Sequence, residues 1–149
     1  MFSQFDYLSE ILPDFPQIQT ISRVTGLNGM EEAMENIRTI KTLILLAEDT
    51  DSGFLDLSQG NFDNGYHTFA IIDLAKLGDS ADRLRALNAC MSAGLKILSR
   101  MMADAQNFGD PCYGFDRSRV DYQRIGPLVN NCFGYMFSYI LRNENFKLE

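Results

Sequence analysis

The longest regular pattern in the chain is a helical repeat of apolar residues between Gly78 and Asp110. Apolar residues recur there at steps of three or four, which is the spacing of one face of an α-helix. The sequence therefore predicts one long amphipathic helix whose apolar stripe is buried by the remaining elements. The stripe consists of Leu84, Leu87, Met91, Leu95, Leu98, Met102 and Ala105.

Both ends of this predicted helix carry suitable residues. Asp79 or Ser80 supplies a side-chain oxygen that can accept a free N–H of the first turn, and Gly109 with Pro111 ends the helix. Gly94 lies beside the stripe, although glycine inside a helix costs about 1 kcal/mol relative to alanine. We therefore expect Gly94 to permit the close approach of a strand.

Alternating patterns on either side of the helix predict two β-hairpins. The first joins a strand at Thr39–Glu48, which is apolar on both faces and hence central or covered on its second face, to a strand at Gly65–Leu74. The second joins Tyr113–Gly126 to Cys132–Leu141 through a turn at Pro127–Asn131. The predicted fold class is α+β: an antiparallel four-stranded sheet (two hairpins) packed on one long helix, with an N-terminal helix.

The last predicted strand has two unlike faces. One face is heavily aromatic and is expected to carry one hydrophobic layer, and the other face is smaller and is expected to meet a neighbour closely. The pattern leaves open which of the two lies under the long helix. The aromatic face holds Phe133, Tyr135, Phe137, Tyr139 and Leu141.

We expect a single domain over residues 1–149, in which an N-terminal helical region (1–38) precedes an α+β core (39–142). The length suits one core, because a chain of about 150 residues buries roughly 70% of its unfolded surface. The predicted elements of the N-terminal region are a helix over Phe2–Leu12, an irregular or short helical connection over Phe15–Val24, and further helical turns over Met30–Ile37.

The segment Asp49–Gly65 is polar and contains glycine, and it is interpreted as a solvated loop. A calcium loop is the alternative, but the spacing fails because Gly60 stands at the twelfth position, where an EF-hand needs glutamate. Three apolar residues are unusual on a fully solvated loop. We expect Phe54, Leu55 and Leu57 to pack on the domain or on a neighbouring subunit.

The net charge of −7 argues against a phosphate-binding surface, so no sequence-specific nucleic acid is expected as a partner. Cys90, Cys112 and Cys132 lack the spacing of a zinc site or a disulfide framework and are expected to be reduced. No basic and apolar leader is visible at the start. The longest apolar run, Leu43–Ala47, is too short to span a membrane. A membrane is therefore not expected as a partner.

A basic strip is the other candidate interface. Arg117, Arg119 and Arg124 lie close in sequence and can contact an acidic partner or nucleic acid. The alternative is cross-strand pairing with an acidic residue, namely Asp116, Asp121 or Glu144.

No catalytic or metal motif occurs, so the sequence predicts no catalytic residue, no cofactor and no metal ligand. His67 is the only histidine and is expected to be exposed at the mouth of the first hairpin. An enzyme whose site is shared between subunits, around His67, Asp63 and Arg119, is the least favoured hypothesis. The candidate interface residues are Phe54, Leu55, Leu57, Arg117, Arg119 and Arg124.

Four stretches within residues 39–142 are similar to a known group of viral proteins. They are Gly60–His67 (GNFDNGYH), Leu77–Asp82 (LGDSAD), Tyr113–Arg119 (YGFDRSR) and Gly134–Tyr139 (GYMFSY). In these stretches and in its predicted layout, the chain resembles the phage tail-terminator and tail-completion family of long-tailed bacteriophages, which includes the lambda tail terminator. It also resembles prophage proteins of Bacteroides-type bacteria.

The resemblance implies a non-enzymatic assembly protein of a phage or prophage tail, acting as a tail-terminator or head–tail joining ring subunit. The implied partners are further copies of the chain in a homo-oligomeric ring, which is typically a hexamer in that family, and the tail-tube and head-connector proteins. The implied location is the virion or the host cytoplasm. The alternative function is a small cellular protein- or ligand-binding module that uses the cleft between helix and sheet.

Overall fold

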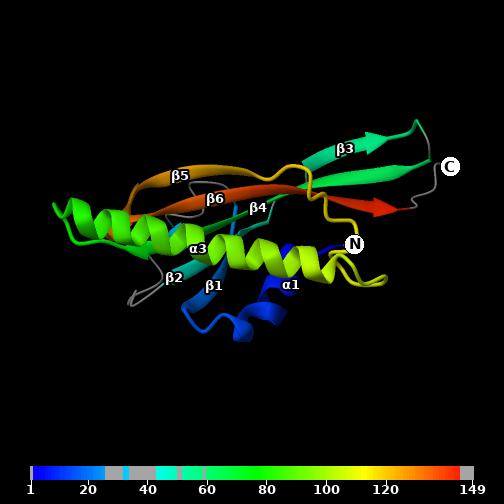
Figure 1. Ribbon diagram of the computed structural model, residues 1–149. Helices are drawn as coiled ribbons and strands as arrows, with labels where there is room; N and C mark the ends of the chain where they lie inside the picture. The colour runs from blue at the N-terminus through cyan, green and yellow to red at the C-terminus, as the bar shows by residue number, and fades with distance from the viewer. Residues whose placement is uncertain (1, 26–31, 34–42, 50–51, 59, 145–149) are drawn as a thin grey trace.

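The computed structural model describes residues 2–25, 32–33, 43–49, 52–58 and 60–144, and Figure 1 shows how the elements are arranged. The predicted helical turns over Met30–Ile37 lie outside the described residues, apart from Glu32 and Ala33, which are helical. In chain order the elements are α1 (Gln4–Ile11), a 3₁₀ turn (Leu12–Asp14), β1 (Ile18–Val24), β2 (Leu43–Glu48), β3 (Ser52–Asp56), β4 (Phe62–Leu74), α3 (Ser80–Asp104), β5 (Asp121–Leu128), a second 3₁₀ turn (Val129–Asn131) and β6 (Cys132–Glu144).

The described strands form one six-stranded mixed sheet in the order β1-β2-β4-β6-β5, with β3 paired to β4 beside β2. The β1–β2 pair is parallel, and the other pairs are antiparallel. The predicted antiparallel four-stranded sheet packed on one long helix is therefore wrong. The two hairpins were anticipated only in part, and β1 and β3 are the strands that the pattern did not predict.

β1 was hidden by its spacing. Ile18, Ile21 and Val24 are three residues apart, which favours a helix, whereas the β-branched side chains themselves favour a strand. The neighbouring β2 decides the outcome, because its side chains are buried on both faces and its backbone pairs on both edges. The prediction that the apolar strand ending at Glu48 is central is confirmed, since β2 lies between β1 and β4.

β3 lies inside the segment that was interpreted as a loop. Its residues pair with residues 62–66, so β4 begins at Phe62 and not at Gly65. Gly53 stands opposite Gly65, and a Cβ at Gly53 would collide with the backbone carbonyl of Asn64. The two glycines obscure the strand pattern in the sequence, yet they allow the backbones of β3 and β4 to pair closely.

α3 is shorter than predicted and is turned differently. Asp79 is the N-cap, as one of the two predicted candidates, and its carboxylate accepts the Asp82 N–H at 3.0 Å. Leu84 and Leu95 of the predicted stripe are 58% and 54% exposed, so the stripe is wrong at these positions. The face that packs on the sheet is Ala86, Leu87, Cys90, Ala93, Gly94, Ile97, Leu98 and Met101.

The size of the side chains explains this rotation. Half of the residues on the face towards the strands are small, namely Ala86, Cys90, Ala93 and Gly94, and at Gly94 the α3 backbone lies close to the ring of Phe137 of β6. A Cβ on Gly94 would overlap the ring of Phe137, which confirms the predicted close approach of a strand at this glycine. The larger Leu84 and Leu95 would hold the helix further away, and they remain on its outer side.

The core occupies both faces of the sheet. On one face α1 and α3 cover Phe69 of β4, together with Phe137 and Tyr139, so the aromatic face of β6 is the one beneath the helices. The opposite face is also buried, and Ala33 is among the residues that pack against it. That second cluster contains Val24, Ile44, Leu46, Ala70, Ile72, Ile125 and Cys132.

The second hairpin differs from its prediction at its start. Residues 113–120 are turns and coil apart from an isolated bridge between Phe115 and Leu141, and β5 begins only at Asp121. The turn is confirmed near its predicted place, because Val129–Asn131 form the 3₁₀ turn. Asn130 and Asn131 adopt positive φ values of 61° and 57° there, which asparagine tolerates better than most residues.

A three-stranded arm extends the sheet past its central part. β2 pairs with residues 69–72 of β4, whereas β3 pairs with residues 62–66 of the same strand. Residues 140–144 of β6 pair with that same end of β4. We call β3 and these two strand ends the arm, and Figure 1 shows it reaching away from β1 and β2.

Candidate functional site on the three-stranded arm

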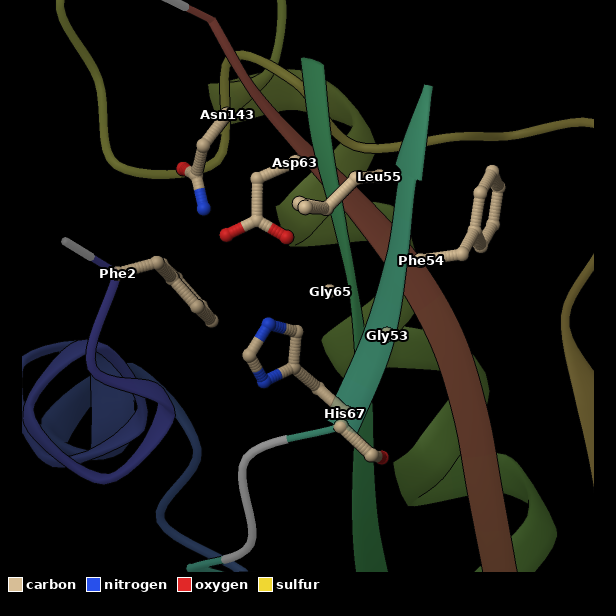
Figure 2. A pocket seen from close by; sticks show the side chains of 9 residues that line it. Phe2, Gly53, Phe54, Leu55, Asp63, Gly65, His67 and Asn143 are labelled. Atoms are coloured by element: carbon tan, nitrogen blue, oxygen red, sulfur yellow. The ribbon is translucent and has the colours of Figure 1, made fainter. Parts of the chain in front are cut away.

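A pocket of about 340 Å³ lies where the arm meets the chain just before α1 (Figure 2). Its walls come from segments that are far apart in sequence. The pairing of β3, β4 and β6 brings these segments together. Their lining residues lie on the side of the sheet that faces the helices, with the exception of Ser52 and Phe54. The lining residues are Phe2, Ser52, Gly53, Phe54, Leu55, Asp63, Gly65, His67 and Asn143.

His67 lies at one side of this pocket, between two aromatic rings. Its ring centroid is 5.0 Å from that of Phe2, in an edge-on arrangement, and 5.5 Å from that of Tyr139. A Cβ on Gly65 would lie 2.9 Å from His67 Nε2, so this glycine makes room for the imidazole. The expectation of an exposed histidine is wrong, because His67 is half-buried and its Nε2 is enclosed.

Asp63 and Asn143 form a directly opposed cross-strand pair on the helix-side face of β4 and β6. Leu55 pairs with Asp63 from the other side, and Figure 2 shows all three side chains around the pocket. Asp63 and Asn143 are both half-buried. Within the described part of the chain, no hydrogen bond or ion pair reaches the Asp63 carboxylate.

The opposite face of the arm is aromatic and partly exposed. Phe54 points away from the pocket (Figure 2) and lies 5.8 Å from the ring of Tyr66, and each side chain is 45% exposed. The Arg142 guanidinium lies over the Phe62 ring at 4.6 Å and donates to Asn64 Oδ1 at 3.1 Å. These contacts hold the three arm strands together on this face.

The three predicted apolar interface residues therefore occupy different places. Phe54 is on the aromatic face, and Leu55 lies beside the pocket with 58% of its surface exposed. Leu57 follows the end of β3 and is 53% exposed. Each of the three is at least 45% exposed among the described residues, and Phe54 makes its ring contact with Tyr66 inside the domain.

The structure does not unite the three arginines of the predicted basic strip. Arg119 binds Asp121 at 3.0 Å, which is one of the acidic partners named in the alternative, but the two residues are two apart in the chain and do not pair across strands. Asp121, the partner of Arg119, is paired with Ser138, and Arg124 is paired with Tyr135. The side chains of Asp121 and Arg124 therefore lie on opposite faces of β5. Among the described residues, Arg117 and Arg124 form no ion pair.

The least favoured enzymatic site is also only partly assembled. Asp63 and His67 line one pocket, as that hypothesis requires. Arg119 instead lines a second pocket of about 320 Å³ with Tyr66, Asp121 and Ser138. Since Tyr66 and His67 are adjacent on one strand, the two pockets open on opposite faces of the sheet.

Two lining residues, Phe2 and Asn143, were not candidates in the sequence. They stand near the two ends of the chain, and no local pattern links them to Asp63. A carboxylate and an amide on strands of opposite direction become neighbours only when the register is known. The sequence feature that could have indicated the site is the mixture of polar residues and glycine in the stretch GNFDNGYH. Most of this stretch was interpreted as part of a loop.

No protein-family model matches this sequence, and no curated protein matches it. Among the described residues, no group of three or more histidine, cysteine, aspartate or glutamate side chains is placed to hold a metal ion. None of the helices in the described ranges is long and apolar enough to cross a membrane. The arm and its pocket are therefore the features on which a function can be argued.

Proposed function

We propose that this chain is a non-enzymatic assembly protein that binds other protein chains, including further copies of itself, through the edge of its arm. The observation that carries this proposal is the exposure of Phe54 and Leu55 on β3. In the described part of the chain β3 pairs only with β4, so its other edge is free to accept a strand. An exposed apolar edge strand is a ready template for pairing with another chain.

The finer form of the proposal follows the resemblance to phage tail terminators. In that form the chain is a ring subunit of a phage or prophage tail, with the tail tube and head connector as further partners. Head-to-tail pairing through two unlike surfaces generates closed rings when the rotation closes. An arm edge on one side of the subunit and a different surface on its neighbour satisfy this requirement.

The test is the oligomeric state, measured by size-exclusion chromatography with light scattering over a range of concentrations. Phe54→Lys should shift the population towards monomer, because it places a charge on the exposed apolar edge. Leu84→Lys is the matched control, since Leu84 is similarly exposed but lies on α3. A wild-type monomer at all concentrations, alone and with isolated tail-tube protein, would overturn the proposal.

A small ligand-binding module is the second candidate. Its predicted location, the cleft between α3 and the sheet, is filled at Gly94 by the ring of Phe137. The pocket at the arm is the observation that favours a ligand-binding module as the second candidate. A ligand that binds there without any change of oligomeric state would favour a binding module over an assembly protein.

A further inference from the structure

We infer that the pocket formed by Phe2, Leu55, Asp63, His67 and Asn143 binds a primary alkylammonium group. This inference does not rest on the assembly function: Leu55 belongs to both sites, but the ligand class depends on the carboxylate and the amide in the pocket and not on the free edge of β3. It is set by the Asp63 carboxylate, the Asn143 amide and the two apolar walls. His67 lies beside them and serves as the reporter.

The charge of the ligand follows from Asp63. This carboxylate is half-buried and is the only acidic group among the described lining residues, which include one histidine, His67, and no lysine or arginine. No described residue compensates it by a hydrogen bond or an ion pair, and an uncompensated charge is costly to withdraw from water. A cation is therefore favoured and an anion is repelled, and the net charge of −7 acts in the same direction.

The hydrogen-bonding groups match an ammonium. An ammonium has three donors and no acceptor, and it therefore needs several oxygens around it. Asp63 supplies a carboxylate, and the Asn143 amide lies directly opposite in register. Figure 2 shows the amide nitrogen turned towards Asp63, and a half-turn of the amide about its last bond presents the oxygen to an ammonium instead. Figure 2 shows both groups on the same side of the pocket, next to the space between Phe2 and Leu55.

The apolar walls favour an organic amine over a metal ion. Phe2 and Leu55 offer only carbon to the pocket, whereas hard divalent cations prefer a shell of oxygen ligands and water. The face of an aromatic ring attracts an ammonium, and apolar side chains cover its alkyl stem. The volume of about 340 Å³ is at the small end of the range for ligand sites, roughly 300–1,000 Å³, which suits a short amine.

The test uses His67 as the reporter. Since the chain has one histidine, its ring protons give a single set of NMR signals that reports on this pocket alone. Titration with n-butylammonium should shift these signals in a saturable manner, while n-butanol, of similar length but uncharged, should not. Equal shifts with both compounds would show a merely apolar cavity and would overturn the inference.

Two variants separate binding from folding. Asp63→Asn keeps the shape of the side chain and should weaken n-butylammonium binding by about tenfold or more, while Asp121→Asn, the matched control on the other face, should leave it unchanged. Leu55→Lys places an ammonium on the residue paired with Asp63 and should block the added amine. Unchanged binding in folded Asp63→Asn protein would overturn the inference.

The source of the ammonium is distinguished by a second ligand. If Nα-acetyl-lysinamide binds at least as well as n-butylammonium, the site accepts a lysine side chain of a protein. If only n-butylammonium binds, the site accepts a free small amine. Zn²⁺ is titrated in parallel, and an Asp63-dependent response to Zn²⁺ without any response to amines would overturn the inference. Leu57→Lys, at an exposed residue that follows β3 and does not line the pocket, should retain amine binding, and its oligomeric state is measured in parallel, so a failure of the assembly proposal is recognised separately.

Discussion

Gly94 of α3 lies against the ring of Phe137 of β6 so closely that even a methyl group at this position would overlap the ring. The two residues mark a point of close approach between α3 and the sheet. They show how the cost of a glycine inside a helix is offset by packing, because only the absence of a side chain lets α3 lie on an aromatic strand.

The first prediction concerns this contact. Gly94→Ala improves helix propensity by about 1 kcal/mol, yet we expect it to lower the free energy of unfolding by about 1–3 kcal/mol, because overpacking displaces Phe137. Urea denaturation measures the change. Ser92→Ala, at an exposed position of the same helix, is the control and should be neutral or slightly stabilising. A more stable Gly94→Ala protein would show that the contact is loose.

A second prediction concerns the hydrogen bonds that attach α1 to the sheet. Tyr139 donates to Gln4 Oε1 at 2.8 Å, and Gln4 Nε2 in turn donates to the Thr68 carbonyl at 2.8 Å. Tyr139→Phe leaves the buried amide oxygen without this donor, so the free energy of unfolding should fall by about 1–3 kcal/mol. Thermal and urea denaturation measure it. Tyr122→Phe, at an exposed ring, should change nothing.

The start of α3 supplies a third prediction, which separates two residues that the sequence could not. Asp79 accepts the Asp82 N–H, so Asp79→Ala should reduce the free energy of unfolding by about 1 kcal/mol. Ser80 is the first residue of the helix and makes no capping bond, so Ser80→Ala should be neutral. Chemical denaturation of both variants is the measurement, and the reverse order of effects would contradict the assignment.

The fourth prediction concerns alkaline pH. Burial raises the pKa of the Cys132 thiol to about 11 and that of Cys112 to about 12, from a usual value of 9.0, and it raises the pKa of Cys90 further. Above pH 9.0 the unfolded thiols lose protons that the folded thiols retain. The stability that these thiols contribute is therefore complete below pH 9.0 and is lost as the pH rises towards 11.

Urea denaturation at about pH 8 and about pH 10 measures this loss, which approaches 1.4 kcal/mol per pH unit for each thiol, an order-of-magnitude figure. Cys132→Ala should reduce the difference in the free energy of unfolding between the two pH values by about the contribution of one thiol. All three thiols should also resist a thiol reagent until the protein unfolds, because each is buried. Rapid labelling of the folded protein would contradict this account.

Several parts of the fold were predictable from local pattern. The long helix, a cap at Asp79 or Ser80 and the role of Gly94 follow from residue types whose preferences act over one or two turns. The central position of β2 follows from an apolar run with no polar face. In each case the decisive information lies within a short stretch of sequence.

The remaining parts depend on partners that are distant in sequence. β1 forms because β2 needs a neighbour on its second edge, although the spacing of Ile18, Ile21 and Val24 favours a helix. β3 forms because Gly53 and Gly65 permit close pairing, although both weaken any local strand pattern. The buried side of α3 is decided by the aromatic rings beneath it, and these select its small residues in preference to Leu84 and Leu95.

The candidate site likewise depends on residues that are distant in sequence. The sequence by itself identified the exposed apolar residues Phe54, Leu55 and Leu57, because such side chains are out of place in a polar loop. Only the tertiary structure decided that Phe54 and Leu55 lie on opposite faces of an arm, and that Asp63 meets residues from both ends of the chain. The physical reason is register: side chains alternate along a strand, so the pairing of strands determines which of them become neighbours.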